Sequence, residues 1–184
     1  MSANVEIKAR MKNPDALHAS LKRLTEEPPV RLQQEDVFFA VPKGRLKMRS
    51  DEDGHCELIY YRRKDEKGPV LSRYFRQQVL APEETRRELE QRYGVKNVVK
   101  KLRELYRLRN ARIHLDFVED LGDFVEIEIV LDSPQGANRG KHAAKHLMRL
   151  LQIDTEDLVE SAYDDLLNPK HAKRRKRVSH PSNK

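Results

Sequence analysis

Apolar and charged residues alternate along most strand-like segments of this chain. Val5-Glu-Ile-Lys8 shows the pattern near the start, and Val125-Glu-Ile-Glu128 repeats it in the last such segment. Successive side chains of a strand point to opposite faces of the sheet, so each segment has one apolar face and one charged face. The charged face is either a solvated surface or, if the sheet curls inward, the lining of a cavity suited to polyanions and metal ions.

The same periodicities predict eight strands and three helices. Gly94 is expected to end the second helix, and Gly54 to adopt a positive φ in a hairpin turn. A loop is expected over 132–140. The strands are expected at residues 3–11, 30–41, 45–50, 55–63, 70–79, 95–109, 111–119 and 124–131. The helices are expected at residues 14–24, 82–93 and 141–151, followed by a short helical region over 156–167.

This order of elements predicts an α+β fold. Short turns join most consecutive strands, which favours antiparallel pairing, and eight antiparallel strands can close into a barrel. In such a barrel the helices cover the apolar face and the charged face lines the lumen. This arrangement is the inverse of an ordinary barrel core, and it requires metal, phosphate or water to neutralise the lining charges.

Composition favours one compact domain, which we place at residues 1–167. Charged residues make up 36% of the 184 residues, yet strand-like apolar segments persist. The single cysteine, Cys56, excludes an internal disulfide and is expected as a small residue of the fourth strand. With no apolar stretch near the roughly 20 residues of a membrane span and no signal-peptide segment, we expect a cytoplasmic protein without a membrane partner.

Basic residues are concentrated at the C-terminus. Residues 168–184 contain seven basic residues and no acidic ones, so residues 1–167 carry 37 − 7 = 30 basic against 30 acidic residues. A formally neutral domain argues against nucleic-acid binding by the folded part. We expect a disordered basic tail at 168–184. It would act either as a nuclear import signal read by an import receptor or as an electrostatic arm that contacts acidic partners.

Two sets of charged residues are candidates for chemistry. The acidic set could hold a hard divalent cation such as Mg²⁺ or Mn²⁺, or form cross-strand ion pairs. The basic set could bind phosphate oxygens, or be a solvated sheet face. The acidic set is Glu6, Asp116, Glu126 and Glu128. The basic set is Lys8, Lys47, Arg49, Arg62 or Arg63, Arg73, Lys101, Arg103 and Arg112.

Two weaker patterns lie near residue 140. The segment from Gly136 to His142 has the wrong glycine spacing for a phosphate-binding loop, and His142 stands where Ser or Thr should bind magnesium. His142 and His146 lie four residues apart on a predicted helix, but no third ligand is near them in sequence. We expect this histidine pair to be solvated.

Three stretches resemble the CYTH superfamily, the triphosphate tunnel metalloenzymes. They are Val5-Glu-Ile-Lys8, the segment from Arg112 to Glu128 with its Leu-Gly-Asp-Phe-Val-Glu-Ile-Glu end, and Glu160-Ser-Ala-Tyr-Asp-Asp-Leu-Leu167. The resemblance covers residues 3–167. It implies a closed tunnel and a substrate class that ranges from thiamine triphosphate and inorganic tripolyphosphate to ATP.

The resemblance also implies roles for individual residues. Glu6, with Asp116, Glu126 and Glu128, would hold the metal, and Glu6 or Glu128 would orient the attacking water. Lys8, Lys47, Arg49, Arg63, Arg73, Lys101, Arg103 and Arg112 would contact phosphate, and Ser161 and Tyr163 would close the tunnel. One departure is Asn4, which stands where the family signature has a carboxylate.

Three functions follow from this resemblance. The favoured one is metal-dependent hydrolysis of a small triphosphate. The first alternative is an adenylyl cyclase of class IV type that makes cyclic AMP and pyrophosphate from ATP. The second is a non-catalytic module that binds polyphosphate or a nucleotide, which Asn4 makes plausible.

Overall fold

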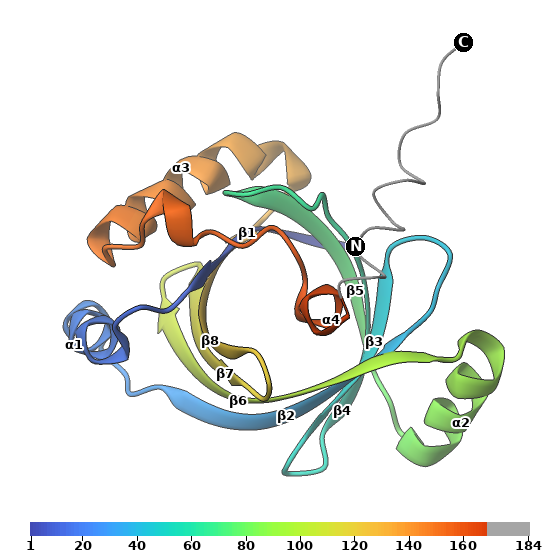
Figure 1. Cartoon of the computed structure of the whole chain (residues 1–184). Helices are drawn as coiled ribbons and strands as arrows, with labels where there is room; N and C mark the ends of the chain where they lie inside the picture. The colour runs from blue at the N-terminus through green and yellow to red at the C-terminus, as the bar shows by residue number, and fades with distance from the viewer. Residues whose placement is uncertain (169–184) are drawn as a thin grey trace.

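Eight antiparallel strands close into a barrel in the computed structural model, which describes residues 1–168 (Figure 1). Neighbouring strands around the barrel follow the order β1-β5-β4-β3-β2-β6-β7-β8. The predicted closed barrel is therefore confirmed. The strands are β1 (Ser2–Arg10), β2 (Val30–Phe39), β3 (Arg45–Asp51), β4 (Cys56–Arg62), β5 (Val70–Gln78), β6 (Val95–Leu108), β7 (Ala111–Val118) and β8 (Gly122–Leu131).

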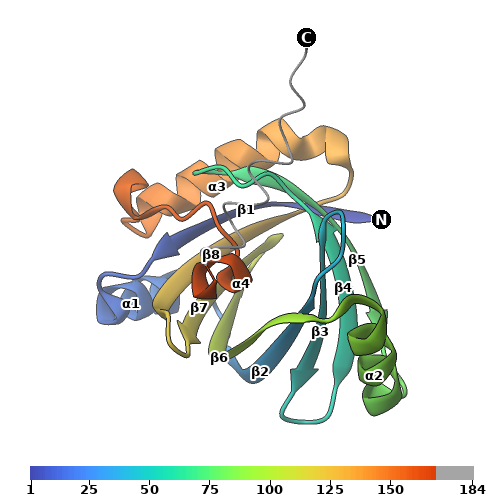
Figure 2. The ribbon, with the colours of Figure 1, turned by 45° about the vertical axis from the view of Figure 1, so that its right-hand side comes forward.

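The main hydrophobic core lies outside the barrel. The outward side chains of β1, β7 and β8 pack against α1 (Pro14–Leu24) and α3 (Ala137–Leu150), which lie on one side of the barrel (Figure 2). A smaller cluster beneath α2 (Pro82–Tyr93) joins Leu89 and Tyr93 to Val37, Phe39 and Met48. Apolar burial therefore stabilises the sheet from outside and leaves the inner face for charged residues.

Two of the predicted helical segments differ from the structure. Helix α3 begins at Ala137 and contains Gly140, which had been assigned to a loop. A Cβ at Gly140 would come within 2.9 Å of side-chain atoms of both Val5 and Leu131, so glycine allows the helix to approach β1 and β8 closely. The segment from Gly136 to His142 packs on the outer, apolar face of the sheet, away from the lumen. This position agrees with the conclusion that it is not a phosphate-binding loop.

The predicted helical region 156–167 is also divided. A 3₁₀ turn (Thr155–Asp157) is followed by extended chain and then by α4 (Tyr163–Leu167). The Val159 N–H donates to the Lys8 carbonyl at 2.8 Å, and Leu158 forms a β-bridge with Ala9. The chain is held extended here because it pairs with the end of β1 before it turns into the barrel.

Other local predictions are confirmed. Gly54 in the β3–β4 hairpin has φ 82°, and Gly94 ends α2 with φ 71°. Cys56 is buried in β4, while His142 and His146 are exposed on α3. None of the helices within residues 1–168 has the length and apolar character needed to cross a membrane. The predicted basic tail lies outside the described residues apart from Asn168, and its disorder stays a prediction.

Candidate active site in the barrel lumen

A cavity of about 310 Å³ occupies the barrel lumen. Its volume lies at the lower end of the range of small-ligand pockets. Inward-pointing side chains of all eight strands line it, because every second residue of each strand faces the lumen. The predicted site residues among the lining are Glu6, Lys8, Lys47, Arg49, Arg63, Lys101, Arg103, Arg112, Glu126 and Glu128.

Two predicted site residues do not line the cavity. Arg73 is exposed on the outer face of β5, because its neighbours Ser72 and Tyr74 are the ones that point inward. The prediction that it contacts substrate in the tunnel is wrong for this reason. Asp116 points inward but is fully buried, and its carboxylate pairs with Arg103 at 2.5 Å through both oxygens. Asp116 therefore supports Arg103 instead of offering open ligand positions to a metal.

One side of the lumen, which we call the acidic wall, consists of Glu6, His114, Glu126 and Glu128. In the strand register Glu128 lies opposite Glu6 of β1, and Glu126 lies opposite His114 of β7. Single ligand atoms of His114, Glu126 and Glu128 all lie within 4.8 Å of one another. Carboxylate and imidazole donors at this spacing fit a divalent cation.

The carboxylates of the acidic wall differ in their electrostatic surroundings. Burial, together with the charges of Glu128 and Glu126, raises the pKa of Glu6. Burial acts in the same direction on Glu126, but Lys8, His114 and Arg103 hold its pKa well below the usual value. Opposite shifts in one cavity favour a proton-accepting role for Glu6 and a permanently anionic, metal-holding role for Glu126.

Neighbouring residues set the state of the other two members of the acidic wall. Burial would raise the pKa of Glu128, but His114, Arg112 and Arg103 lower it, and Arg112 lies 2.7 Å from its Oε2. Burial and the charge of Arg103 lower the pKa of His114. The imidazole is therefore neutral at neutral pH, which leaves one ring nitrogen with a free lone pair.

The opposite side of the lumen, which we call the basic wall, consists of Asp36, Lys47, Arg49 and Lys101. Asp36 Oδ2 lies 2.7 Å from Lys47 and 3.6 Å from Lys101, and Arg49 contacts both carboxylate oxygens of Asp36. One buried carboxylate thus faces three cations. Although burial opposes it, these cations hold the pKa of Asp36 well below its usual value.

The lumen has more cations than carboxylates. Nine cations against seven carboxylates give 9 − 7 = +2, although residues 1–167 are formally neutral. An excess of positive charge in a largely enclosed cavity favours an anionic ligand. The cations are Lys8, Lys47, Arg49, Arg63, Arg76, Lys101, Arg103, Arg107 and Arg112. The carboxylates are Glu6, Asp51, Glu57, Glu126 and Glu128, which line the cavity, and the buried Asp36 and Asp116.

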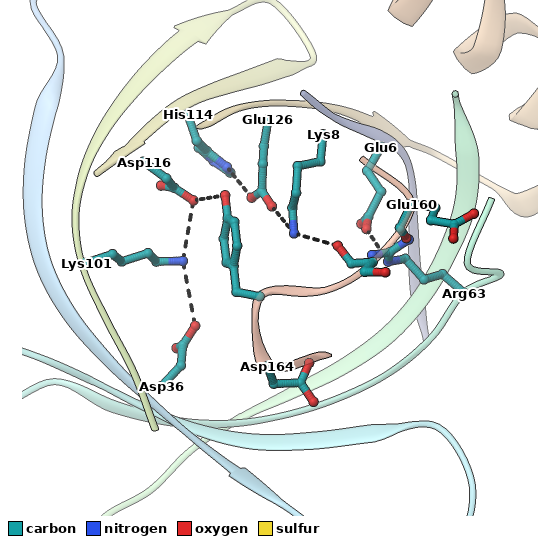
Figure 3. Close-up of polar contacts among 12 residues, drawn as sticks. Glu6, Lys8, Asp36, Arg63, Lys101, His114, Asp116, Glu126, Glu160 and Asp164 are labelled. Atoms are coloured by element: carbon teal, nitrogen blue, oxygen red, sulfur yellow. Dashed lines mark hydrogen bonds and ion pairs between the residues drawn. The ribbon is translucent and has the colours of Figure 1, made fainter. Parts of the chain in front are cut away.

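Helix α4 lies inside one end of the barrel and brings Tyr163 into the lumen (Figure 1). The Tyr163 hydroxyl donates to Asp116 Oδ2 at 2.9 Å, and the Lys8 Nζ lies 3.5 Å from the ring centroid. The chain before the helix is held by backbone carbonyls, since Lys8 donates to Ser161 O and Arg63 to Glu160 O (Figure 3). Tyr163 thus lies in the lumen and Ser161 close to it in the chain, while closure of the tunnel by these two residues stays a prediction.

Ion pairs anchor α4 from below. Lys96 Nζ lies 2.5 Å from both Asp164 Oδ2 and Asp165 Oδ1, and Arg45 lies 2.6 Å from Asp165. The four side chains are at most 5% exposed. Breaking such a buried pair costs about 3–5 kcal/mol, so α4 is firmly held at this end of the barrel.

Asp36 and His114 are two of the lumen residues that the sequence analysis did not assign to the site. His114 lies between Arg112 and Asp116 at spacing two, so its place on the charged face was readable from the alternation. Asp36 follows Gln33-Gln-Glu in a segment without clear alternation, and only the pairing of β2 with β3 and β6 shows that it meets Lys47, Arg49 and Lys101.

The fold and the site together define a class, the tunnel proteins, in which a closed barrel encloses a charged lumen. Comparison with known proteins agrees with this class. The chain belongs to the CYTH domain family, whose model matches residues 2–163. The resemblance read from the sequence motifs is thereby confirmed.

Individual relatives share most of their length with this chain. A protein of Methanocaldococcus jannaschii, provisionally named an adenylate cyclase, is 24% identical over 88% of this chain and 97% of its own. The PH1012 structure of Pyrococcus horikoshii OT3 is 29% identical, with a TM-score of 0.78 over 91% of this chain and 100% of its own. HpAC1 of Hippeastrum is 16% identical, with a TM-score of 0.63, and the match covers 94% of this chain and 96% of the HpAC1 chain. The HpAC1 likeness concerns the fold alone.

Proposed function

We propose that this protein is a metal-dependent hydrolase of a small triphosphate. The observation that carries the proposal is the pairing of two unlike walls in one cavity. The acidic wall offers His114, Glu126 and Glu128 within 4.8 Å of one another, and the lumen as a whole has an excess of two cations. A linear anion with a bound divalent cation matches both features at once.

The two walls would have different roles, which follow from the charges around each residue. Lys47, Arg49 and Lys101 would exchange part of their contact with Asp36 for phosphate oxygens, which arginine forks and lysine ammonium groups bind well. A divalent ion held by the acidic wall would supply charge neutralisation at the scissile phosphorus. Glu6, whose pKa burial raises, would accept a proton from the attacking water, since a base is most effective when its pKa is near the working pH.

The relatives agree with this reading to different degrees. HpAC1, provisionally named an adenylyl cyclase, is described as having a dominant triphosphatase activity, which supports hydrolysis on this fold. The Methanocaldococcus jannaschii relative carries an adenylate cyclase name, which makes cyclisation of ATP the second candidate. In a cyclase the same walls would hold the triphosphate while a ribose hydroxyl, in place of water, attacked the α-phosphorus.

One experiment separates the candidate functions. The purified chain is incubated with tripolyphosphate, thiamine triphosphate or ATP and with Mg²⁺ or Mn²⁺, and phosphate, pyrophosphate and cyclic AMP are followed. Release of phosphate that depends on the metal supports the hydrolase. Cyclic AMP with pyrophosphate would favour the cyclase, and ligand binding without any product would favour a non-catalytic module.

A further inference from the structure

His114 is the only nitrogen donor among the three residues that could share one cation in the described part of the chain. Its side chain is 5% exposed and points toward Glu126, as Figure 3 shows. Its Nδ1 is buried and has no hydrogen-bond partner. A buried polar atom without a partner costs free energy, which a ligand at this position would recover.

The spacing of the donors fits shared coordination better than hydrogen bonding. His114 Nδ1 lies 3.6 Å from Glu126 Oε2, which is beyond normal hydrogen-bond length. Neighbouring ligands at bonds of about 2.1 Å lie roughly 3.0–3.4 Å apart in octahedral or tetrahedral geometry. A movement of a few tenths of an ångström would therefore bring both atoms onto one ion.

A second unpartnered atom points into the same cavity. Asn4 is 3% exposed, lines the cavity, and its Oδ1 has no hydrogen-bond partner. It precedes Glu6 by two residues on the inner face of β1, and Glu6 lies opposite Glu128. Together with Asn4, the acidic wall therefore offers imidazole, carboxylate and amide donors.

We propose that His114 is an inner-sphere ligand of the cation held by Glu126 and Glu128, and that it makes the site select a first-row transition ion such as Mn²⁺ over Mg²⁺. Mg²⁺ prefers oxygen ligands and loses its water reluctantly, whereas transition ions accept imidazole more readily. The inference deepens the proposed function by naming the class of metal, and it rests on that function only for what the metal does there.

Metal binding to the chelator-treated protein tests the inference without any substrate. Mn²⁺ binding is titrated by electron paramagnetic resonance, with Mg²⁺ as competitor, and pulsed measurements detect a ¹⁴N coupling from a coordinated ring. Wild type should show this coupling. In His114→Asn the coupling should disappear, and Mn²⁺ affinity should fall at least about tenfold. Mg²⁺ affinity should change much less.

The matched control is His142→Asn, because this histidine is exposed on α3 and far from the donors in sequence and fold. It should leave the nitrogen signal and both affinities unchanged. The melting temperature of each variant is measured after chelator treatment, and His114→Gln is included as a second substitution at the same position. A variant that melts like wild type but binds Mn²⁺ less tightly has lost a ligand and kept its fold.

Each outcome decides one of the two proposals. Tight Mn²⁺ binding without nitrogen coupling in wild type would overturn the role of His114 and leave a metal-dependent triphosphatase standing. An equal loss of Mn²⁺ and Mg²⁺ affinity in folded His114→Asn would overturn the proposed selectivity. A nitrogen-coupled Mn²⁺ site in a protein that hydrolyses no triphosphate would uphold the ligand and overturn the proposed function.

Discussion

The acidic and basic walls are both built from titratable side chains in the barrel lumen, but their charges are balanced in opposite ways. In the basic wall one carboxylate, Asp36, faces three cations. In the acidic wall, Glu126 and Glu128 lie close to His114, whose Nδ1 has no hydrogen-bond partner, and Glu6 lies opposite Glu128. Counted by these residues alone, the basic wall has a surplus of cations. The acidic wall has a surplus of carboxylates, which pair with cations beside it: Lys8, Arg63, Arg103 and Arg112. Charge balance within a wall, more than the mere presence of charged residues, indicates which ligand it suits.

The largest effect should follow removal of charge from the acidic wall. Glu126→Gln and Glu128→Gln each remove a candidate metal-holding carboxylate, and kcat for triphosphate hydrolysis should fall by roughly 100-fold or more, at the upper end of effects seen for metal-site residues. Arg73→Gln, on the outer face of β5, is the control and should keep full activity. Undiminished Mg²⁺- or Mn²⁺-dependent turnover in both glutamine variants would contradict the assignment of this wall.

Removing the single anion of the basic wall should lower the free energy of unfolding. It should also make the melting temperature depend more strongly on a bound phosphate ligand. Asp36→Asn leaves three cations without their shared partner, so we expect a loss of about 3 kcal/mol, or roughly 6–12 °C in melting temperature. Tripolyphosphate should raise the melting temperature of this variant more than that of wild type.

Glu35→Gln provides the control on the same strand, because Glu35 points outward and is 36% exposed. It should alter neither property. If Asp36→Asn melted like wild type, the three cations would not depend on Asp36 for compensation.

Adding charge to the acidic wall should strengthen its preference for a cation. Asn4→Glu places a carboxylate at an inward, buried position two residues before Glu6. The metal concentration for half-maximal activity should fall by up to about tenfold, equivalent to ~1.4 kcal/mol. A weaker response to metal in Asn4→Glu, with no effect of Asn4→Ala, would remove position 4 from the metal site.

The two electrostatic environments within the acidic wall predict stability changes of opposite sign. The pKa of Glu6 in the folded protein is raised above 4.5, which means that ionising this carboxyl is harder in the folded than in the unfolded state. The folded protein therefore loses stability as pH rises from 4.5 to the raised pKa. With chelator at neutral pH, Glu6→Gln should melt higher than wild type, by about 2 °C, and the gain should vanish near pH 4.

Glu126→Gln should melt lower at neutral pH. Glu126 has a folded pKa below 4.5, and its contribution to stability is present above 4.5 and is lost as pH falls. Melting curves from pH 4 to 8 measure both variants. Shifts of the same sign would refute the division of roles between the two carboxylates.

The smallest effect is expected from the basic tail. Its seven cations belong to neither wall, so a chain that ends at Asn168 should keep the melting temperature and kcat of the full protein. Thermal melts and initial rates at low ionic strength, where long-range attraction is strongest, provide the check. A large loss of either property would mean that the tail takes part in folding or in the reaction.

The alternation of residues determined much of the fold. It predicted all eight strands and the separation of an apolar face from a charged face, because side-chain direction along a strand depends only on position in the chain. The resemblance to the family then favoured an inward charged face and chose Arg63 over Arg62. Ten of the predicted site residues line the lumen. Arg73 was misplaced because its inward neighbours, Ser72 and Tyr74, carry no charge and give the alternation no marker.

Only the tertiary structure decided which charges meet. Glu6 lies opposite Glu128 through the pairing of β1 with β8, which joins the two ends of the chain of strands, and His114 lies opposite Glu126 through the pairing of β7 with β8. Asp116 is removed from the cavity by Arg103 and by Tyr163, which arrives from a helix 47 residues later. Alternation fixes the face of each residue locally. Its partners across the lumen depend on register and closure, which are set by packing over the whole chain.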